Sequence, residues 1–299
     1  DASGNSKPIT KIKEIKHSTS GASIRIHPLG ATILSYIDAS GHENLFVSET
    51  AVLNGTKPIR GGIPTVFPIF GPPELAWDTM PQHGFSRRNV WTETKSYDNA
   101  TSAGVVYELK FPDAVTSGRG KRNPWEKDGC KCTLELVVDF NGETMTTKMV
   151  MKNTGEKAFP FQALLHTYYA VAGSKALDPT QCFVKGLEGY TCKDKVTKEP
   201  EYGIGSEPIT ISRATDRVYT PPEGKPVVDV EIGVGGGKTV ALKAFAKVAG
   251  TEVATSCVVW NPFKEGAASM GDFGNTQYNA MICVEPGILS GAPDLAPGK

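Results

Sequence analysis

The sequence predicts an all-β protein built as a large antiparallel β-sandwich. Apolar residues alternate, or run together with many β-branched members, in the segments 104–109, 133–139, 145–151, 227–232 and 239–245. The 32 glycines and 21 prolines among 299 residues place turn signals between these segments. No long segment shows the 3.6-residue period of an amphipathic helix. Many short strands joined by short turns are typical of a sandwich.

Two glycine-containing segments are predicted to be turns between strands. Asn141-Gly142 joins two alternating segments, which is a strong signal for a β-hairpin. The segment 233–239, Gly-Val-Gly-Gly-Gly-Lys-Thr, resembles a phosphate-binding loop, but Ile232 stands where that motif requires glycine. The residues after Thr239 alternate like a strand instead of opening a helix. We therefore expect a glycine-rich hairpin there.

One domain is expected to span residues 1–299. The chain is longer than most domains, but all-β sandwiches often reach this length. No low-complexity linker and no strict repeat divides it into halves.

Charge and hydropathy argue against nucleic-acid and membrane partners. The 32 basic and 32 acidic residues cancel, so no net field attracts a polyanion or an anionic bilayer. No apolar run approaches the roughly 20 residues that a membrane span needs. Six cysteines in a chain this long are too few for a disulfide framework, and a strand holds the Cα atoms of Cys130 and Cys132 near or beyond the distance that a disulfide can bridge. We expect a monomer in the cytoplasm, although a chain that starts at Asp1 could have lost a leader.

Two basic segments place guanidinium groups in apolar or glycine-rich surroundings. Arg60 lies between Ile59 and Gly61-Gly62, where it could clamp an oxyanion bidentately or cap carbonyls at a tight turn. In the second segment Gln82 and His83 precede two arginines. Neighbours in a strand point to opposite faces, so in an extended segment only one arginine faces the same site as His83, and we favour Arg87 over Arg88.

An imidazole and a carboxylate lie within two other apolar segments. His166 belongs to a strand-like run over 163–171 and shares a face with Tyr168, although a lone histidine there can also be a satisfied core group. Glu285 ends the apolar run 280–285, just before Pro286-Gly287, which is expected to terminate the strand. A carboxylate at this place is unusual, and its alternative role is to pair with a lysine or arginine.

Three of these candidate side chains could instead bind a zinc ion. His83, His166 and Glu285 are the ligand types of a catalytic zinc site. The sequence has no His-Glu-x-x-His motif and no Cys-x2-Cys pair, so we predict no metal.

Six motifs in a fixed order resemble the glucose-6-phosphate 1-epimerase family, the hexose-6-phosphate mutarotases, within the larger aldose 1-epimerase group. The resemblance runs from about Ile24 to Leu289. Its motifs are Ile59-Arg-Gly-Gly-Ile-Pro, Gln82-His-Gly-Phe-Ser-Arg, Leu165-His-Thr-Tyr-Tyr, Asp216-Arg-Val-Tyr, Val259-Trp-Asn-Pro-Phe and Val284-Glu-Pro-Gly.

This resemblance implies a β-supersandwich of the galactose mutarotase type that interconverts the α and β anomers of a hexose 6-phosphate without metal or other cofactor. It implies that His166 and Glu285 are the acid and base. The substrate-binding residues that it implies are Arg60, Gln82, His83, Arg87 and Asp216. Residues 117–131 are more basic than the family pattern; Lys121, Arg122 and Lys127 there could reach the same phosphate or form a solvated loop.

Anomer exchange calls for these residue types on chemical grounds as well. Opening a hemiacetal removes the proton of the O1 hydroxyl while the ring oxygen O5 receives one. We expect Glu285 to accept the O1 proton and a protonated His166 to donate to O5, with the histidine pKa kept up by a nearby carboxylate. His83 and Asp216 would then bind sugar oxygens. The alternatives are an aldose 1-epimerase for free sugars and a carbohydrate-binding protein without activity.

Overall fold

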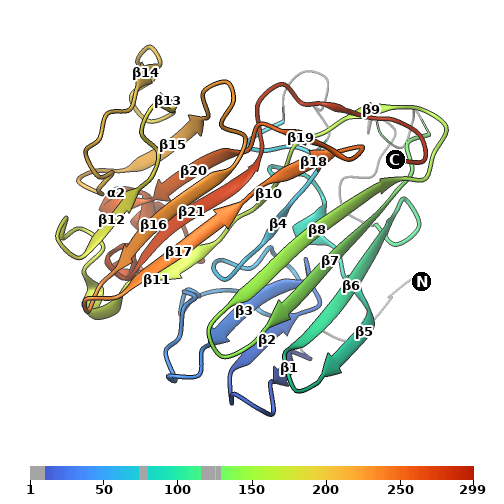
Figure 1. The fold of residues 1–299 in the computed structure, drawn as a ribbon, viewed down its shortest axis with the longest axis horizontal. Coiled ribbons are helices and arrows are strands. Elements are labelled where there is room, and N and C mark those ends of the chain that lie inside the picture. The colour runs from blue at the N-terminus through green and yellow to red at the C-terminus, as the bar shows by residue number, and fades with distance from the viewer. Residues whose placement is uncertain (1–10, 74–79, 116–124, 126–128) are drawn as a thin grey trace, which may run out of the picture.

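The computed structural model describes residues 11–73, 80–115, 125 and 129–299, and strands dominate them (Figure 1). The helical elements in these ranges are short. They are α2 (Phe263–Ser269) and the 3-10 turns η2 (Ser86–Arg88), η3 (Ala172–Ser174) and η4 (Gln277–Ala280). The predicted all-β class is confirmed. No helix among the described residues is long and apolar enough to cross a membrane.

An antiparallel four-stranded sheet contains three of the five predicted strands. It has the order β5 (Thr92–Asp98), β6 (Ala103–Phe111), β7 (Cys132–Phe140) and β8 (Met145–Asn153). Along β7 every second residue is buried, as the period-two pattern requires. The predicted hairpin at Asn141-Gly142 joins β7 to β8. Its turn has four residues, 141–144, and the Asn141 Oδ1 accepts the N–H groups of Glu143 and Thr144.

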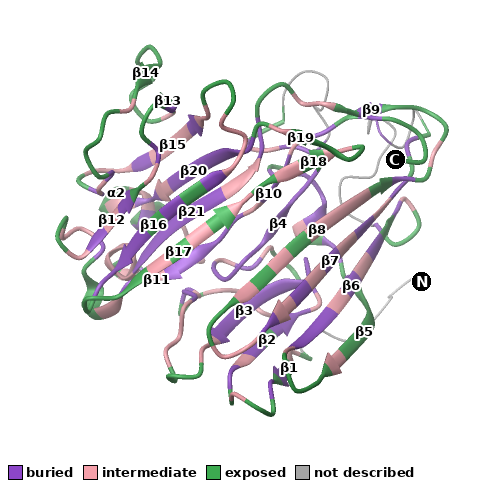
Figure 2. Ribbon diagram, viewed as in Figure 1, coloured by how far each residue is buried: buried purple, intermediate pink, exposed green. Residues whose placement is uncertain are grey.

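A second sheet carries the residues of interest. Its order is β14-β13-β15-β20-β21-β10-β4, and β11 also pairs with β21. The bounds are β4 (Thr65–Val66), β10 (Ala163–Leu165), β11 (Tyr168–Ala170), β13 (Thr191–Asp194), β14 (Tyr202–Gly203), β15 (Thr215–Thr220), β20 (Ser256–Asn261) and β21 (Met281–Ile288). β20 and β21 are buried almost throughout (Figure 2), which marks them as central strands.

One face of this sheet packs against a three-stranded sheet. Tyr219, Val259 and Val284 on one face belong to a hydrophobic cluster with residues of a three-stranded sheet. That sheet consists of β12 (Cys182–Lys185), β16 (Val228–Val234) and β17 (Thr239–Ala244), so the predicted segments 227–232 and 239–245 are strands. The loop that resembled a phosphate-binding loop connects β16 to β17, as the hairpin prediction required.

The remaining strands complete the molecule. β1 (Lys13–Lys16), β2 (Ser23–His27) and β3 (Thr32–Ile37) form one sheet. Two-stranded pairs join β9 (Phe159–Pro160) to β22 (Asp294–Leu295), and β18 (Ala246–Val248) to β19 (Thr251–Val253). Side chains of β1–β3 and of β6 and β7 share the largest core cluster, which also holds Phe67, Phe85 and Trp125. Phe85 is fully buried, and burial of one such side chain contributes about 1.5–3 kcal/mol.

The structure corrects two strand boundaries that bear on the site. Pro286-Gly287 does not end the last long strand, because β21 continues to Ile288. The segment 163–171 is not one strand either, because His166 and Thr167 separate β10 from β11. All six cysteines are buried reduced thiols, and Cys130 lies before β7 begins.

Candidate active site

Strand register brings His166 and Glu285 together. Leu164 lies opposite Gly287 in the pairing of β10 with β21, and Tyr168 lies opposite Cys283 in the pairing of β11 with β21. Both pairings follow one register, and continuing it across the gap between β10 and β11 places His166 directly opposite Glu285. Side chains directly opposite in an antiparallel pair have Cβ atoms about 4.5–5.5 Å apart. Two residues remote in the sequence thus become neighbours.

The proline after Glu285 explains why the ladder is interrupted here. In the same register Leu165 lies opposite Pro286, which has no N–H to donate. The next residue must be glycine, because a Cβ on Gly287 would lie 2.3 Å from the Ala163 carbonyl oxygen. The N–H of His166 donates instead to the carbonyl of Pro64 at 2.9 Å. The motif Val284-Glu-Pro-Gly therefore shapes the backbone beside the two ionisable side chains.

The two side chains face each other and keep capacity for further hydrogen bonds. His166 Nδ1 lies 3.2 Å from Glu285 Oε1. His166 is 7% exposed and Glu285 is 1% exposed. Neither His166 Nδ1 nor Glu285 Oε2 has a hydrogen-bond partner among the described residues. Within those residues no lysine or arginine pairs with Glu285, which argues against the simple ion-pair alternative.

Burial favours the neutral form of both groups. It raises the pKa of Glu285 well above its usual value, and the Asp216 charge raises it further, while Lys195 and Arg87 act in the opposite direction. Burial lowers the pKa of His166 well below its usual value, and the charges of Arg87 and Arg60 lower it further. This shift is opposite in direction to the expected one, in which a nearby carboxylate keeps the histidine pKa up.

His83 lies next to this pair in a strained turn. Its φ is 63°, and its ring centroid is 5.7 Å from that of His166. The N–H of Gly71 donates to His83 Nδ1 at 3.1 Å, which leaves the ring proton on Nε2 as a donor. Burial and the Arg87 charge lower the pKa of His83. The following residue is necessarily glycine, because a Cβ on Gly84 would lie 2.0 Å from the Phe67 carbonyl oxygen.

Arg87 reaches the same region, but from a 3-10 turn and not from the extended segment that the sequence suggested. Its terminal nitrogen donates to the Gln82 carbonyl at 3.1 Å, and its buried Nε has no partner among the described residues. Burial lowers the pKa of Arg87 to about 10. Arg88 is exposed and Arg87 is half-buried. Gln82 is exposed and takes part through its carbonyl.

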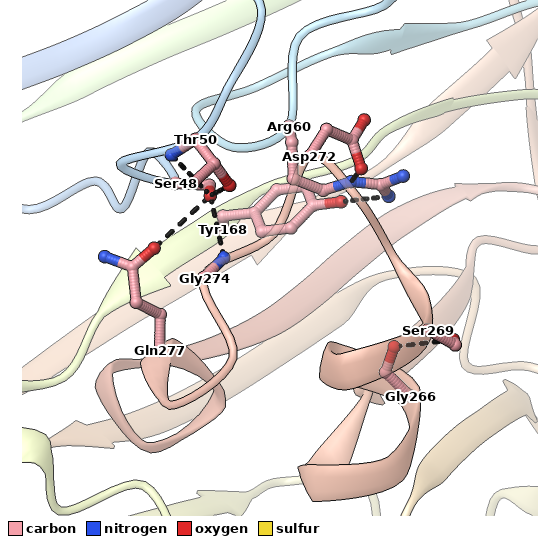
Figure 3. A network of polar contacts seen from close by, with 9 residues as sticks. All are labelled: Ser48, Thr50, Arg60, Tyr168, Gly266, Ser269, Asp272, Gly274 and Gln277. Carbon is pink, nitrogen blue, oxygen red and sulfur yellow. Dashed lines mark hydrogen bonds and ion pairs between the residues drawn. The ribbon is translucent and has the colours of Figure 1, made fainter.

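Arg60 is held by a carboxylate that the sequence did not reveal. Its Nε donates to Asp272 Oδ1 at 3.3 Å, and one terminal nitrogen donates to the Tyr168 hydroxyl at 3.5 Å (Figure 3). The Tyr168 ring stacks on His166 at 4.8 Å between centroids. These contacts, and not the capping of a turn, fix the guanidinium. Gly61 has a φ of 123°, and a Cβ there would lie 2.5 Å from the Phe46 carbonyl oxygen.

A polar network anchors the loop that carries Asp272. The Gly274 N–H donates to Ser48 Oγ at 3.2 Å, and Ser48 donates to Gln277 Oε1 at 3.3 Å (Figure 3). Phe273 is buried against Phe46, with ring centroids 5.7 Å apart. Nothing in the spacing of these residues singled out Asp272, because the contact joins segments about 200 residues apart.

Asp216 projects from β15 and pairs with a second unpredicted residue. Lys195 Nζ lies 3.2 Å from Asp216 Oδ2. The basic group Lys121, Arg122 and Lys127 lies outside the described residues.

The possible metal ligands that the structure brings together differ from the three that the sequence suggested. Among the described residues, His166, Cys283 and Glu285 bring possible ligand atoms within 4.8 Å of one another, and His83 is not part of that group. Burial raises the pKa of the Cys283 thiol well above its usual value, which opposes thiolate formation.

Comparison with known proteins gives the family. The sequence pattern of aldose 1-epimerases matches residues 12–299. The chain belongs to the aldose 1-epimerase family. It is therefore a sugar epimerase, an isomerase whose substrate is a small carbohydrate.

Curated relatives of this epimerase come from plants and bacteria. A protein of Cenchrus ciliaris, provisionally named glucose-6-phosphate 1-epimerase, is 28% identical over 92% of this chain and 77% of its own length. A protein of Escherichia coli K12 with the same provisional name is 30% identical over 87% of this chain and 78% of its own length.

Solved structures show the same fold. A mutarotase, also provisionally assigned, from Salmonella typhimurium has a TM-score of 0.74 at 23% identity, covering 96% of this chain and 86% of that one. A galactose mutarotase related enzyme from Lactobacillus acidophilus has a TM-score of 0.69 at 14% identity, covering 97% and 94%. The predicted galactose mutarotase-like fold is confirmed.

Proposed function

We propose that this epimerase is a glucose-6-phosphate 1-epimerase, which interconverts the α and β anomers of hexose 6-phosphates. The observation that carries the proposal is the facing pair of His166 and Glu285, 3.2 Å apart and buried, with Arg60 and Arg87 close enough to lower the histidine pKa. The names of the plant and Escherichia coli relatives support the phosphorylated substrate.

The pair supplies both proton transfers of ring opening. Glu285 as carboxylate takes the O1 proton while His166 as imidazolium gives a proton to O5, and the C1–O5 bond breaks as the carbonyl forms. After this step Glu285 is protonated and His166 is neutral. Once rotation about C1–C2 presents the other carbonyl face, His166 takes the O5 proton, Glu285 returns its proton to O1, and the ring closes as the other anomer. One proton on the pair thus serves both directions.

The flanking groups would bind the substrate. The Nε2–H of His83 is a donor for a sugar oxygen, since its Nδ1 is already occupied by the Gly71 N–H. Asp216 would accept a hydrogen bond from a ring hydroxyl, and Gln82 would line the entrance. Arg60 and Arg87 would bind the phosphate, because a dianion gains charge-assisted hydrogen bonds from guanidinium groups.

Anomer exchange measured by NMR on glucose 6-phosphate and on glucose tests the proposal. We expect the wild type to accelerate exchange of the phosphorylated sugar with the larger kcat/KM. Glu285→Gln and His166→Ala should each lower kcat by about 10²–10⁴ without loss of folded structure by circular dichroism. Equal or better activity on glucose would instead favour an aldose 1-epimerase for free sugars. Wild-type activity in either variant would refute the assigned roles, and binding without any exchange would indicate a carbohydrate-binding protein.

A further inference from the structure

The backbone of Lys195 is fixed from two sides. The preceding residue, Asp194, is 2% exposed, and its Oδ1 accepts the N–H groups of Val196 and Thr197. Its Oδ2 binds Arg213 at 2.9 Å and Arg217 at 3.0 Å. The Lys195 N–H donates to the Asp216 carbonyl at 2.8 Å. The chain therefore leaves β13 in one defined direction, and Lys195 is the first residue after that strand.

The side chain of Lys195 points into the residues already described. Its ammonium lies 3.2 Å from Asp216 Oδ2 and 4.8 Å from the centroid of the Phe70 ring. The Phe70 ring is in turn 5.3 Å from that of His83. Cation–π contact and an ion pair together restrict the long lysine side chain to this position. Its charge also lowers the pKa values of Glu285, His166 and His83, which places it within electrostatic reach of all three.

Lys195 and Arg60 lie at opposite ends of the site. Strand register puts Tyr168, Cys283, Trp260 and Asp216 in one row across β11, β21, β20 and β15. Neighbouring strands are about 4.8 Å apart, so the row spans roughly 14 Å. Arg60 contacts Tyr168 at one end, and Lys195 contacts Asp216 at the other. A phosphate bound by Arg60 is therefore remote from Lys195.

We propose that Lys195 is a positioning residue, which holds the Asp216 carboxylate where it receives a ring hydroxyl of the sugar. The inference rests on the proposed function. Among the described residues, Asp216 forms an ion pair with Lys195 alone. Without that ammonium, nothing fixes the direction of the Asp216 carboxylate. Its negative charge would also act on Glu285 without the compensation that Lys195 gives.

Lys195→Met tests the inference, with Lys195→Arg as the conservative variant and Lys193→Met as the control. Lys193 is exposed and carries the same charge two residues away. We expect Lys195→Met to lower kcat/KM about tenfold for glucose 6-phosphate and for glucose alike, mainly through KM. Lys195→Arg should recover most of this loss, and Lys193→Met should match the wild type. In an Asp216→Asn background, Lys195→Met should cause no further loss.

Three results would overturn the inference: kcat/KM within twofold of the wild type, a loss confined to the phosphorylated sugar, or a loss that multiplies with that of Asp216→Asn. Calorimetric binding of glucose 6-phosphate gives a second measurement that does not depend on turnover, and Lys195→Met should weaken it about tenfold. A wild type that binds but does not exchange anomers refutes the proposed function and leaves the binding comparison decisive for Lys195. A wild type that neither binds nor exchanges refutes both.

Discussion

Replacing Arg60 with methionine should separate recognition of the phosphate from recognition of the sugar. Methionine keeps much of the aliphatic volume of arginine but removes the guanidinium. Arg60 contacts Asp272 and the Tyr168 hydroxyl, and it contacts neither His166 nor Glu285 within hydrogen-bond distance. The substitution should therefore affect binding of the anion more than proton transfer.

The size of the effect follows from the donors that remain available. A guanidinium has five N–H donors, and the described contacts use two of them, so three remain for a phosphate. Bidentate binding uses two of these three. Each charge-assisted bond contributes about 1.5–3 kcal/mol, and the lower value applies because Asp272 already compensates part of the charge. The sum is about 3 kcal/mol, which corresponds to about 100-fold in kcat/KM.

The assay is exchange NMR on glucose 6-phosphate and glucose, with Arg88→Met as the control. Arg88 carries the same charge near the site but is exposed. Arg60→Met should lose about 100-fold on the phosphorylated sugar and less than about threefold on glucose. Arg88→Met should change neither value appreciably. Equal losses on the two sugars would refute the assignment of Arg60 to phosphate.

Three further predictions concern stability. The free energy of unfolding should fall between pH 7 and pH 5, because the unfolded chain protonates His83 and His166 below their usual pKa of about 6.5 while burial lowers both pKa values in the folded state. The raised pKa of Glu285 acts in the opposite direction, because ionising this buried carboxyl lowers the free energy of unfolding as pH rises. In urea unfolding, the stability of Glu285→Gln relative to the wild type should therefore increase between pH 5 and pH 8. If it does not increase, the raised pKa is contradicted. Asn261→Ala should cost about 3–4 kcal/mol, because the side chain of the buried Asn261 makes three hydrogen bonds, to Tyr278, Met281 and Phe263. The exposed Asn275→Ala is its control, and equal urea midpoints would show that these bonds contribute little.

The sequence predicts the fold well where local pattern decides it. Alternation identifies β7 and β8, because each residue of these strands faces either the core or solvent. The prediction is wrong at the end of β21, because Pro286-Gly287 indicates a strand end and the strand continues to Ile288. A strand continues through proline when the missing N–H falls at a gap in the neighbouring strand, and the gap between β10 and β11 supplies that condition.

The candidate site could be predicted in its members but not in its contacts. Arg60, His83, His166 and Glu285 were found because each places an ionisable group among apolar or glycine residues. Their partners are ordinary polar residues: Asp272 and Lys195 occur in segments without any special pattern. Which strand lies beside which is a long-range property, and only the register of β21 with its neighbours reveals that His166 faces Glu285.

The protonation state of this pair links the phosphate to the chemistry. The charges of Arg87 and Arg60 add to burial in lowering the pKa of His166, and burial raises the pKa of Glu285. A neutral imidazole facing a protonated carboxyl corresponds to the open-chain stage of the proposed cycle, whereas ring opening begins with the proton on His166. A phosphate dianion on the two arginines compensates their positive charge, which raises the pKa of His166 and favours transfer of the proton from Glu285. A free sugar brings no such charge. Under the proposed function, the same two arginines bind the phosphorylated sugar and also activate it.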